Sequence, residues 1–256
     1  MEEIVLKAIW SAKGYILLGL ISYAIFVVLT APLEFVWPKI QSKIGRLPVQ
    51  IESVTGTIWQ GQAQVKSAQI GSVSASWDIQ VSELLSGNLT ALIDVKGNDL
   101  KLDGKVSTDG DQVEVSGISA FMSSQYLKPL LKQGRAALEG NFELTDFNSV
   151  VTLSDKQIHN AGGRIVFSGG DISFPIDGRK IDAQLPILVG NITKPSDNVD
   201  LAITDTEGNS IGSGYVQPDG WSGLKIRRRL LDLLGQKWPQ DVSEDTVIFE
   251  VSQKLL

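Results

Sequence analysis

The sequence contains no cysteine and a single histidine, His159. The lack of cysteine excludes a disulfide framework, a thiolate metal site and a cysteine nucleophile. A Ser–His–Asp triad is formally open, but His159 lies in a turn-like context just before a Gly-Gly pair. We therefore predict no catalytic residue, and nothing in the sequence argues for an enzyme.

Motifs that hold metals or phosphates are also missing. Asp99, Asp103, Asp109 and Asp111 could supply oxygen ligands for Ca²⁺, but the EF-hand spacing with its terminal Glu is absent. Acidic residues that form hairpin turns explain them more simply. The Gly-Gly pairs are not part of a phosphate-binding loop or a dinucleotide-binding fingerprint. The sequence thus predicts no metal site and no cofactor.

Basic residues are scarce after the N-terminal segment. From Leu47 onward the chain carries 18 Lys and Arg against 26 Asp and Glu, a net charge of −8. Because nucleic-acid phosphates attract clusters of Lys and Arg, this acidic balance argues against a nucleic-acid partner. The exception is the run Arg227-Arg228-Arg229. It could meet an acidic partner or lipid headgroups, or form the solvated face of an amphipathic helix.

One long hydrophobic run stands out, over residues 14–33, with twenty residues and no charge. A helix rises about 1.5 Å per residue, so this run matches the roughly 30 Å hydrocarbon core of a bilayer. A buried core helix would be shorter and keep a polar face, and a cleaved signal peptide would have a shorter apolar region with an A-x-A-like exit. We predict an uncleaved transmembrane anchor over 14–33, after an N-terminal segment 1–13 and before a juxtamembrane linker 34–46.

The charges around this run do not decide its orientation. Lys7 and Lys13 precede it, while Lys39, Lys43 and Arg46 follow it, so a local positive-inside count favours neither side. Within the linker, 38–45 reads either as a short amphipathic turn at the membrane surface or as a simple connection.

From residue 47 to 256 the hydrophobic period changes from helical to two, which is typical of β-strands. Turn residues such as Asn98-Asp99, Asp103-Gly104 and Asp109-Gly110-Asp111 punctuate the strands. Short helices are predicted near 124–132 and 224–234. The strand-like segments are 49–54, 65–77, 89–95, 113–118, 136–144, 148–153, 163–168, 180–189, 201–204, 210–216 and 246–251.

The predicted fold class is therefore mainly β, an antiparallel region that forms a sandwich or a curved sheet. It could also comprise two β halves, with a subdivision near 123–135, where Pro129 limits the helix.

Three features give the chain a resemblance to a known family. The first is the segment Gly56-Thr57-Ile58-Trp59-Gln60-Gly61-Gln62-Ala63, which follows the hydrophobic run closely and is similar to a GT-[LVI]-W-x-G-x-A box. The second is the alternating β body. The third is the ending, 208–218 followed by a Leu-rich helix that closes at Leu233-Leu234-Gly235. Together these features resemble the type II secretion system protein N family.

The resemblance implies a non-catalytic accessory component of the inner membrane, with its N-terminus in the cytoplasm and its bulk in the periplasm. Its expected partners are the inner membrane and other subunits of the type II secretion system, which exports folded proteins across the outer membrane. No nucleic acid and no small-molecule substrate are expected. Exposed strand edges would carry the contacts, since they accept partner strands. Trp59 and Trp77 are expected in the core rather than at an interface.

A rival hypothesis is lipid handling, because membrane-anchored, strand-rich proteins of the lipopolysaccharide-export and AsmA-like kinds use a curved sheet as an apolar groove. A continuous apolar channel would favour this hypothesis, and a solid two-layer core would favour the scaffold. A membrane-bound hydrolase stays open only if His159 lies beside a Ser and an Asp.

Overall fold

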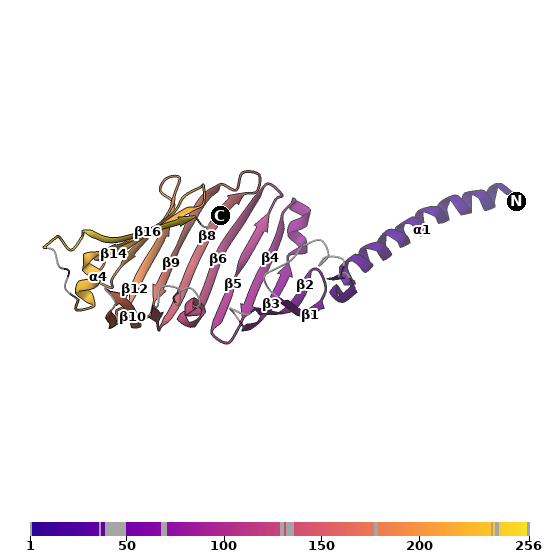
Figure 1. The fold of residues 1–256 in the computed structure, drawn as a ribbon. Helices are drawn as coiled ribbons and strands as arrows, with labels where there is room; N and C mark the ends of the chain where they lie inside the picture. Colours follow the sequence, from indigo (N-terminus) through magenta and orange to yellow (C-terminus); the bar gives the residue numbers. More distant parts are fainter. Residues whose placement is uncertain are drawn as a thin grey trace.

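The described chain forms one very wide antiparallel sheet and one small sheet. The large sheet has 13 strands in the order β1-β2-β3-β4-β5-β6-β8-β9-β12-β13-β14-β15-β16, and the small one has the order β11-β10-β7 (Figure 1). Strands mostly pair with their neighbours in sequence, and β6 pairs directly with β8, so the large sheet is continuous. The computed structural model describes residues 2–35, 37–38, 50–67, 71–128, 131, 136–176, 179–236, 238 and 241–254.

The elements, in chain order, have the following bounds. The N-terminal half contains α1 (Glu2–Thr30), β1 (Gln50–Gly56), β2 (Gln60–Ser67), β3 (Gly71–Ile79), the 3-10 helix η1 (Val81–Ser86), β4 (Leu89–Lys96), β5 (Leu100–Thr108), β6 (Gln112–Ser123) and the 3-10 helix η2 (Ser124–Leu127). The C-terminal half contains β7 (Ala137–Leu138), β8 (Asn141–Thr152), β9 (Ile158–Phe167), β10 (Gly170–Ile176), β11 (Arg179–Leu185), β12 (Leu188–Thr193), β13 (Val199–Thr204), β14 (Ser210–Val216), β15 (Trp221–Arg227), α4 (Arg228–Leu233) and β16 (Val247–Lys254).

The two faces of the large sheet differ in chemistry because side chains alternate along each strand. In register across β2 to β5, one face carries Gln62, Ser76, Asp94 and Asp103. The residues that follow or precede these on each strand point the other way, and they are Ala63, Ala75, Val95 and Leu102. We name these two surfaces the polar face and the apolar face.

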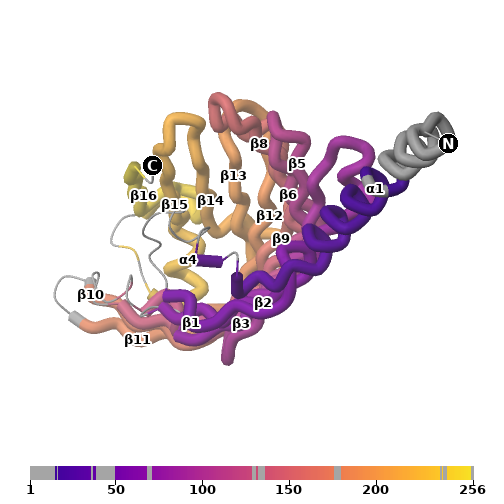
Figure 2. The backbone as a smooth tube through the Cα atoms, turned by 90° about the vertical axis from the view of Figure 1, so that its right-hand side faces the viewer, coloured from indigo at the N-terminus to yellow at the C-terminus, as the bar shows by residue number. Residues whose placement is uncertain are grey.

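Two hydrophobic clusters cover parts of the apolar face. At the β1 end, Leu33 packs with Val54 and Ala63, flanked by Trp37 and Trp77 among others. Over β8 to β12, the small sheet and α4 pack onto the large sheet around the buried residues Phe167, Leu185 and Leu234. In Figure 2, α4 and strands β10 and β11 lie on the same side of the large sheet. Between these clusters the apolar side chains of β4, β5 and β6 are mostly half-buried.

Helix α1 extends away from the β1 end of the sheet (Figure 1). Its described side chains, Tyr15 and residues 17–30, are all exposed, and most of them are apolar. Within the described part of the chain, no helix combines the length and apolarity needed to cross a membrane. The helix predicted over 14–33 is thus present and ends at Thr30, while the membrane span stays a prediction.

Trp59 joins α1 to the sheet through one hydrogen bond. In a helix the carbonyl of Val28 would accept the N–H of residue 32, but residue 32 is Pro, which has none. The indole Nε1 of Trp59 donates to that carbonyl at 3.0 Å. Pro32 also forms an isolated β-bridge with Thr57, and Leu33 is only 3% exposed. The segment around Trp59 therefore satisfies the helix end and fixes where α1 leaves the sheet.

Glycines make this joint compact. Gly56 has φ 93°, a left-handed conformation that ends β1 and starts a tight turn into β2. Gly61 lies under the Trp77 ring, where a Cβ would come within 2.4 Å of ring atom Cζ2. The Trp77 indole donates to the Ile58 carbonyl at 2.9 Å and packs against the β1-end cluster, as expected of a core residue. The segment forms a hairpin, in which β1 ends at Gly56 and β2 begins at Gln60.

Several predicted boundaries were wrong. The segment 65–77 is not one strand but parts of β2 and β3. The pair Asp103-Gly104 is not a turn, since it lies inside β5, where a Cβ on Gly104 would come within 2.3 Å of Ile118 Cδ1. The segments 136–144 and 148–153 contribute to a single bulged strand, β8, in which Asp146 has φ 51°.

The helix predicted over 224–234 is wrong in its first part. Leu224 and Ile226 lie in β15 and pair with Val251 and Phe249 of β16, because alternation places both on the apolar face. Helix α4 begins only at Arg228, where Leu230 and Leu234 reach the second cluster.

The helix predicted over 124–132 is described only in part, as η2 and two further helical residues. In the linker, residues 39–45 of the predicted amphipathic turn lie outside the described residues.

The hairpin turn between β13 and β14 depends on one carboxylate. Asp205 Oδ1 accepts the N–H groups of Glu207 at 2.9 Å and Asn209 at 2.8 Å, and its Oδ2 accepts Asn209 Nδ2 at 2.9 Å. Partial desolvation raises the pKa of Asp205, but these hydrogen bonds outweigh it and hold the pKa below its ordinary value. The ionised form of Asp205 is therefore more stable in the folded protein than in the unfolded chain.

We expect Asp205→Asn to lower the free energy of unfolding at neutral pH. A lowered folded-state pKa contributes stability above the unfolded value of 3.8, and this contribution is lost as the pH falls through the folded-state pKa. The difference between wild type and variant should therefore shrink in acid, as measured by denaturant unfolding from pH 7 to pH 3. Glu207→Gln is the matched control, since that carboxylate accepts only one hydrogen bond, at 3.3 Å. A gap that stays constant down to pH 3 would contradict this account.

We also expect Trp59→Phe to loosen the joint, because it leaves the Val28 carbonyl without its donor. The loss of one hydrogen bond costs about 1 kcal/mol, which corresponds to a Tm lower by about 2–4 °C for a chain of this size. Pro32→Ala restores an N–H at residue 32, so Trp59→Phe should cost less in that background. Thermal unfolding of the four proteins in detergent tests this coupling. Equal losses in both backgrounds would show that the hydrogen bond is not the cause.

Candidate functional site

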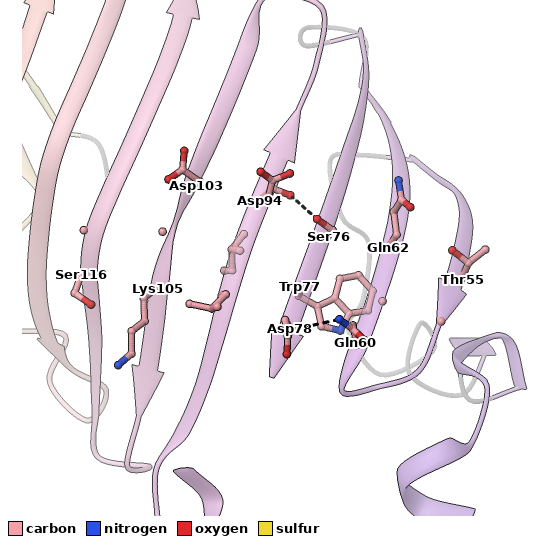
Figure 3. A pocket seen from close by; sticks show the side chains of 16 residues that line it. Thr55, Gln60, Gln62, Ser76, Trp77, Asp78, Asp94, Asp103, Lys105 and Ser116 are labelled. Carbon is pink, nitrogen blue, oxygen red and sulfur yellow. Dashed lines mark hydrogen bonds between the residues drawn. The ribbon is translucent and has the colours of Figure 1, made fainter. Parts of the chain in front are cut away.

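A hollow of about 880 Å³ lies on the polar face across β1 to β6 (Figure 3). Its lining combines acidic, basic and neutral polar residues with glycines and with the apolar residues Trp77, Leu92 and Ile93. The labelled residues are Thr55, Gln60, Gln62, Ser76, Trp77, Asp78, Asp94, Asp103, Lys105 and Ser116. One end of this polar hollow is thus formed by residues of the Gly56 to Ala63 segment.

Two of the three aspartates that line the polar hollow form polar contacts within the sheet. Asp94 pairs with Lys96 at 2.8 Å, and Asp78 Oδ2 accepts Gln60 Nε2 at 3.3 Å. Asp94 lies opposite Asp103 on the next strand. Among the described residues, no three acidic or histidine side chains gather closely enough to hold a metal ion. This arrangement suits weak polar contacts rather than bond-making chemistry.

The apolar face presents an unbroken line of apolar or glycine residues across the whole large sheet. It takes one residue from each strand, and each residue is the register partner of the next. We name this line the apolar row. From β1 to β16 it reads Val54, Ala63, Ala75, Val95, Leu102, Ala120, Leu144, Ile165, Gly190, Ile203, Gly212, Ile226 and Phe249.

Neighbouring strands lie about 4.8 Å apart, so twelve steps give the row a length of about 58 Å. The first cluster covers the β1 end of the row and the second covers its stretch over β8 to β12, but Val95, Leu102 and Ala120 between them are only half-buried. A solid two-layer core is therefore absent over the middle of the described sheet.

The large sheet does not close, and β1 and β16 form its two ends. Strand β16 is eight residues long and contains no Pro. Its side chains are almost all exposed, including Phe249 at 55% and Val251 at 46%. An exposed edge strand offers backbone N–H and C=O groups to another strand.

Two of the three consecutive arginines, Arg227 and Arg229, contact the residues just before β16. Arg229 Nη1 lies 2.7 Å from Glu244 Oε2, and its Nη2 lies 3.1 Å from Asp245 Oδ1. The hydrogen bond to Asp245 is the main cause that raises the pKa of Arg229. Arg227 donates to the Asp245 carbonyl at 2.8 Å, and Arg228 pairs within α4. The basic run is therefore paired with acidic residues of the same chain.

The remaining candidate residues lie apart from one another. The side chain of His159, on β9, forms a hydrogen bond with the Thr152 hydroxyl. Asp109 accepts the N–H groups of Asp111 and Gln112 at 2.9 Å each, and these bonds lower its pKa. Asp99 lies at the opposite end of the nine-residue strand β5 from Asp109, about 30 Å away. Turn formation, as the simpler explanation predicted, accounts for Asp109.

Sequence reasoning missed the apolar row. Each strand shows its apolar alternation in the sequence, but the row exists only once the register of every pair is known. A bulge such as that between Asp103 and Lys105 shifts the register by one residue and cannot be placed from alternation alone.

Comparison with known families matches residues 48–232 to the family model described as type II secretion system (T2SS), protein N. Neither the curated proteins nor the solved structures contain a match to the chain. The matched range runs from the start of the sheet to α4 and confirms the resemblance seen in the sequence. The family is a non-catalytic component of type II secretion, in the cell envelope. The chain belongs to the type II secretion system protein N family.

Proposed function

We propose that this protein is an accessory scaffold of the type II secretion system, held at the inner membrane by α1 with its β region in the periplasm. The observation that carries the proposal is the open large sheet, which ends in the exposed edge strand β16. A pre-formed edge binds a partner strand through main-chain hydrogen bonds, and side-chain pockets add specificity. The partners would be other subunits of the secretion machine.

The anchor part of the proposal is supported by the charge-free run 14–33 and by the exposed apolar side chains of α1. Anchoring raises the effective concentration of the β region near other subunits at the same membrane. The hydrogen bond from Trp59 to the Val28 carbonyl would then set the direction in which the sheet leaves the membrane. On this proposal the N-terminus lies in the cytoplasm.

A second candidate function is lipid binding or transfer in the periplasm, with the sheet as an open groove. One specific observation favours it, the apolar row with its uncovered middle. A contiguous apolar surface that is not fully covered is typical of a binding surface. The two functions use different groups of the molecule, since the scaffold uses backbone at the edges and the groove uses side chains on one face.

In-cell crosslinking distinguishes these functions. With a photoreactive amino acid in place of exposed Val251 on β16, we expect capture of other type II secretion subunits. The same amino acid at exposed Asn160, inside the sheet on β9, is the matched control and should capture none of them. Capture of phospholipid or lipopolysaccharide, with no secretion subunit, would contradict the scaffold and favour the groove.

Truncation tests the anchor. A protein that lacks residues 1–30, exported by an unrelated signal, should remain folded but fail to support secretion of a reporter substrate. Removal of 1–33 should cost a further roughly 2–5 kcal/mol, because it deletes the buried Leu33 from the β1-end cluster. Denaturant unfolding separates these two effects. Normal secretion by the shorter truncation would show that anchoring is not required.

A further inference from the structure

An apolar cavity of about 200 Å³ lies between the large sheet and the small sheet. Strands β8, β9, β12 and β13 supply one wall, and β7 and β11 supply the other. The lining contains only Leu, Ile, Phe and Gly. Its residues are Leu138, Phe142, Ile165, Phe167, Leu185, Leu188, Gly190, Leu201 and Ile203.

This cavity is an extension of the apolar row. Ile165, Gly190 and Ile203 belong to both, and the next row residue toward the middle of the sheet is Leu144. Phe142 lies two residues from Leu144 on the same face, and its ring packs against Phe167 with centroids 5.0 Å apart. A ligand in the cavity could therefore continue along the row without meeting a charged side chain.

The chemistry of the lining selects the occupant. A peptide that entered would bury backbone N–H and C=O groups with no partner, which is costly. Water is also disfavoured, because a dry cavity of about 150 Å³ with similar lining is known to stay empty of water and bind benzene. A hydrocarbon chain has no polar group to satisfy, and it gains from every methylene removed from water.

We propose that the cavity binds the terminal part of a phospholipid acyl chain, whose remainder lies along the apolar row toward Leu144. The exposed apolar side chains of α1 and the charge-free run 14–33 connect this surface with a membrane as the source of the lipid. The inference rests on the second candidate function and places its ligand at Ile165, Gly190 and Ile203 of the row.

The test uses the full chain reconstituted in phosphatidylethanolamine vesicles that contain a phospholipid with a diazirine near the end of one acyl chain. After irradiation, mass spectrometry maps the labelled peptides. We expect adducts on the cavity residues of β8, β9, β12 and β13, in addition to those on α1.

Two cavity variants and one control separate binding from folding. Ile203→Phe fills the cavity, and exclusion of two methylenes alone should reduce cavity labelling about tenfold. Val189→Phe adds similar bulk on the same sheet but on the polar face, between Leu188 and Gly190, and should leave labelling unchanged. Leu188→Ala empties the cavity further, so it should lower the unfolding temperature yet retain labelling.

The labelling pattern distinguishes failure of the cavity inference from failure of the lipid function. Labelling of β3 to β6 peptides without cavity peptides would overturn the inference and leave the lipid function standing. Adducts confined to α1 would overturn both. Loss of labelling that merely follows the unfolding temperature across the three variants would also overturn the inference.

Discussion

The structure depends on one constraint. The apolar face of the large sheet spans thirteen strands and must be kept from water. A compact monomer of 27.7 kDa exposes about 11,000 Å². This chain exposes 17212 Å², partly because α1 projects and partly because the middle of the sheet has a single layer. Burial is concentrated around Leu33 at the β1 end and around Phe167 on β9. Between these two regions the apolar side chains are only half-buried, so the strands depend more on the backbone hydrogen bonds that pair them.

The segment from Gly56 to Ala63 has a physical role that explains its composition. The Pro32 that ends α1 removes the donor of the Val28 carbonyl, and Trp59 replaces it. Gly61 makes room for Trp77, which completes the cluster over β1 and β2. The residues that carried the family resemblance are therefore the joint between helix and sheet. A scaffold needs such a joint, because the direction of the sheet decides which partners its edges reach.

Alternation along single strands was enough to predict a mainly β region and most strand positions, because side-chain period is a local property. Strand pairing depends on residues that are far apart in the sequence, and the predictions that depended on pairing were wrong. Leu224 to Leu234 has leucines at helical spacing, yet β16 captures Leu224 and Ile226 in a sheet, since pairing on the apolar face outweighs local propensity. Asp103-Gly104 reads as a turn, but Gly104 is there because Ile118 crosses over it. The apolar row depends on every register at once and was not predictable.

The edge and the face meet at β16, and this links the two candidate functions. Phe249 is the last residue of the apolar row and also lies on the exposed edge strand. A strand that pairs with β16 must place one of its own side chains opposite Phe249, on the same face. If that side chain is apolar, the partner's sheet continues the row, and if it is charged, the row ends there. Partner choice at the edge thus determines whether an apolar path runs from this protein into the next.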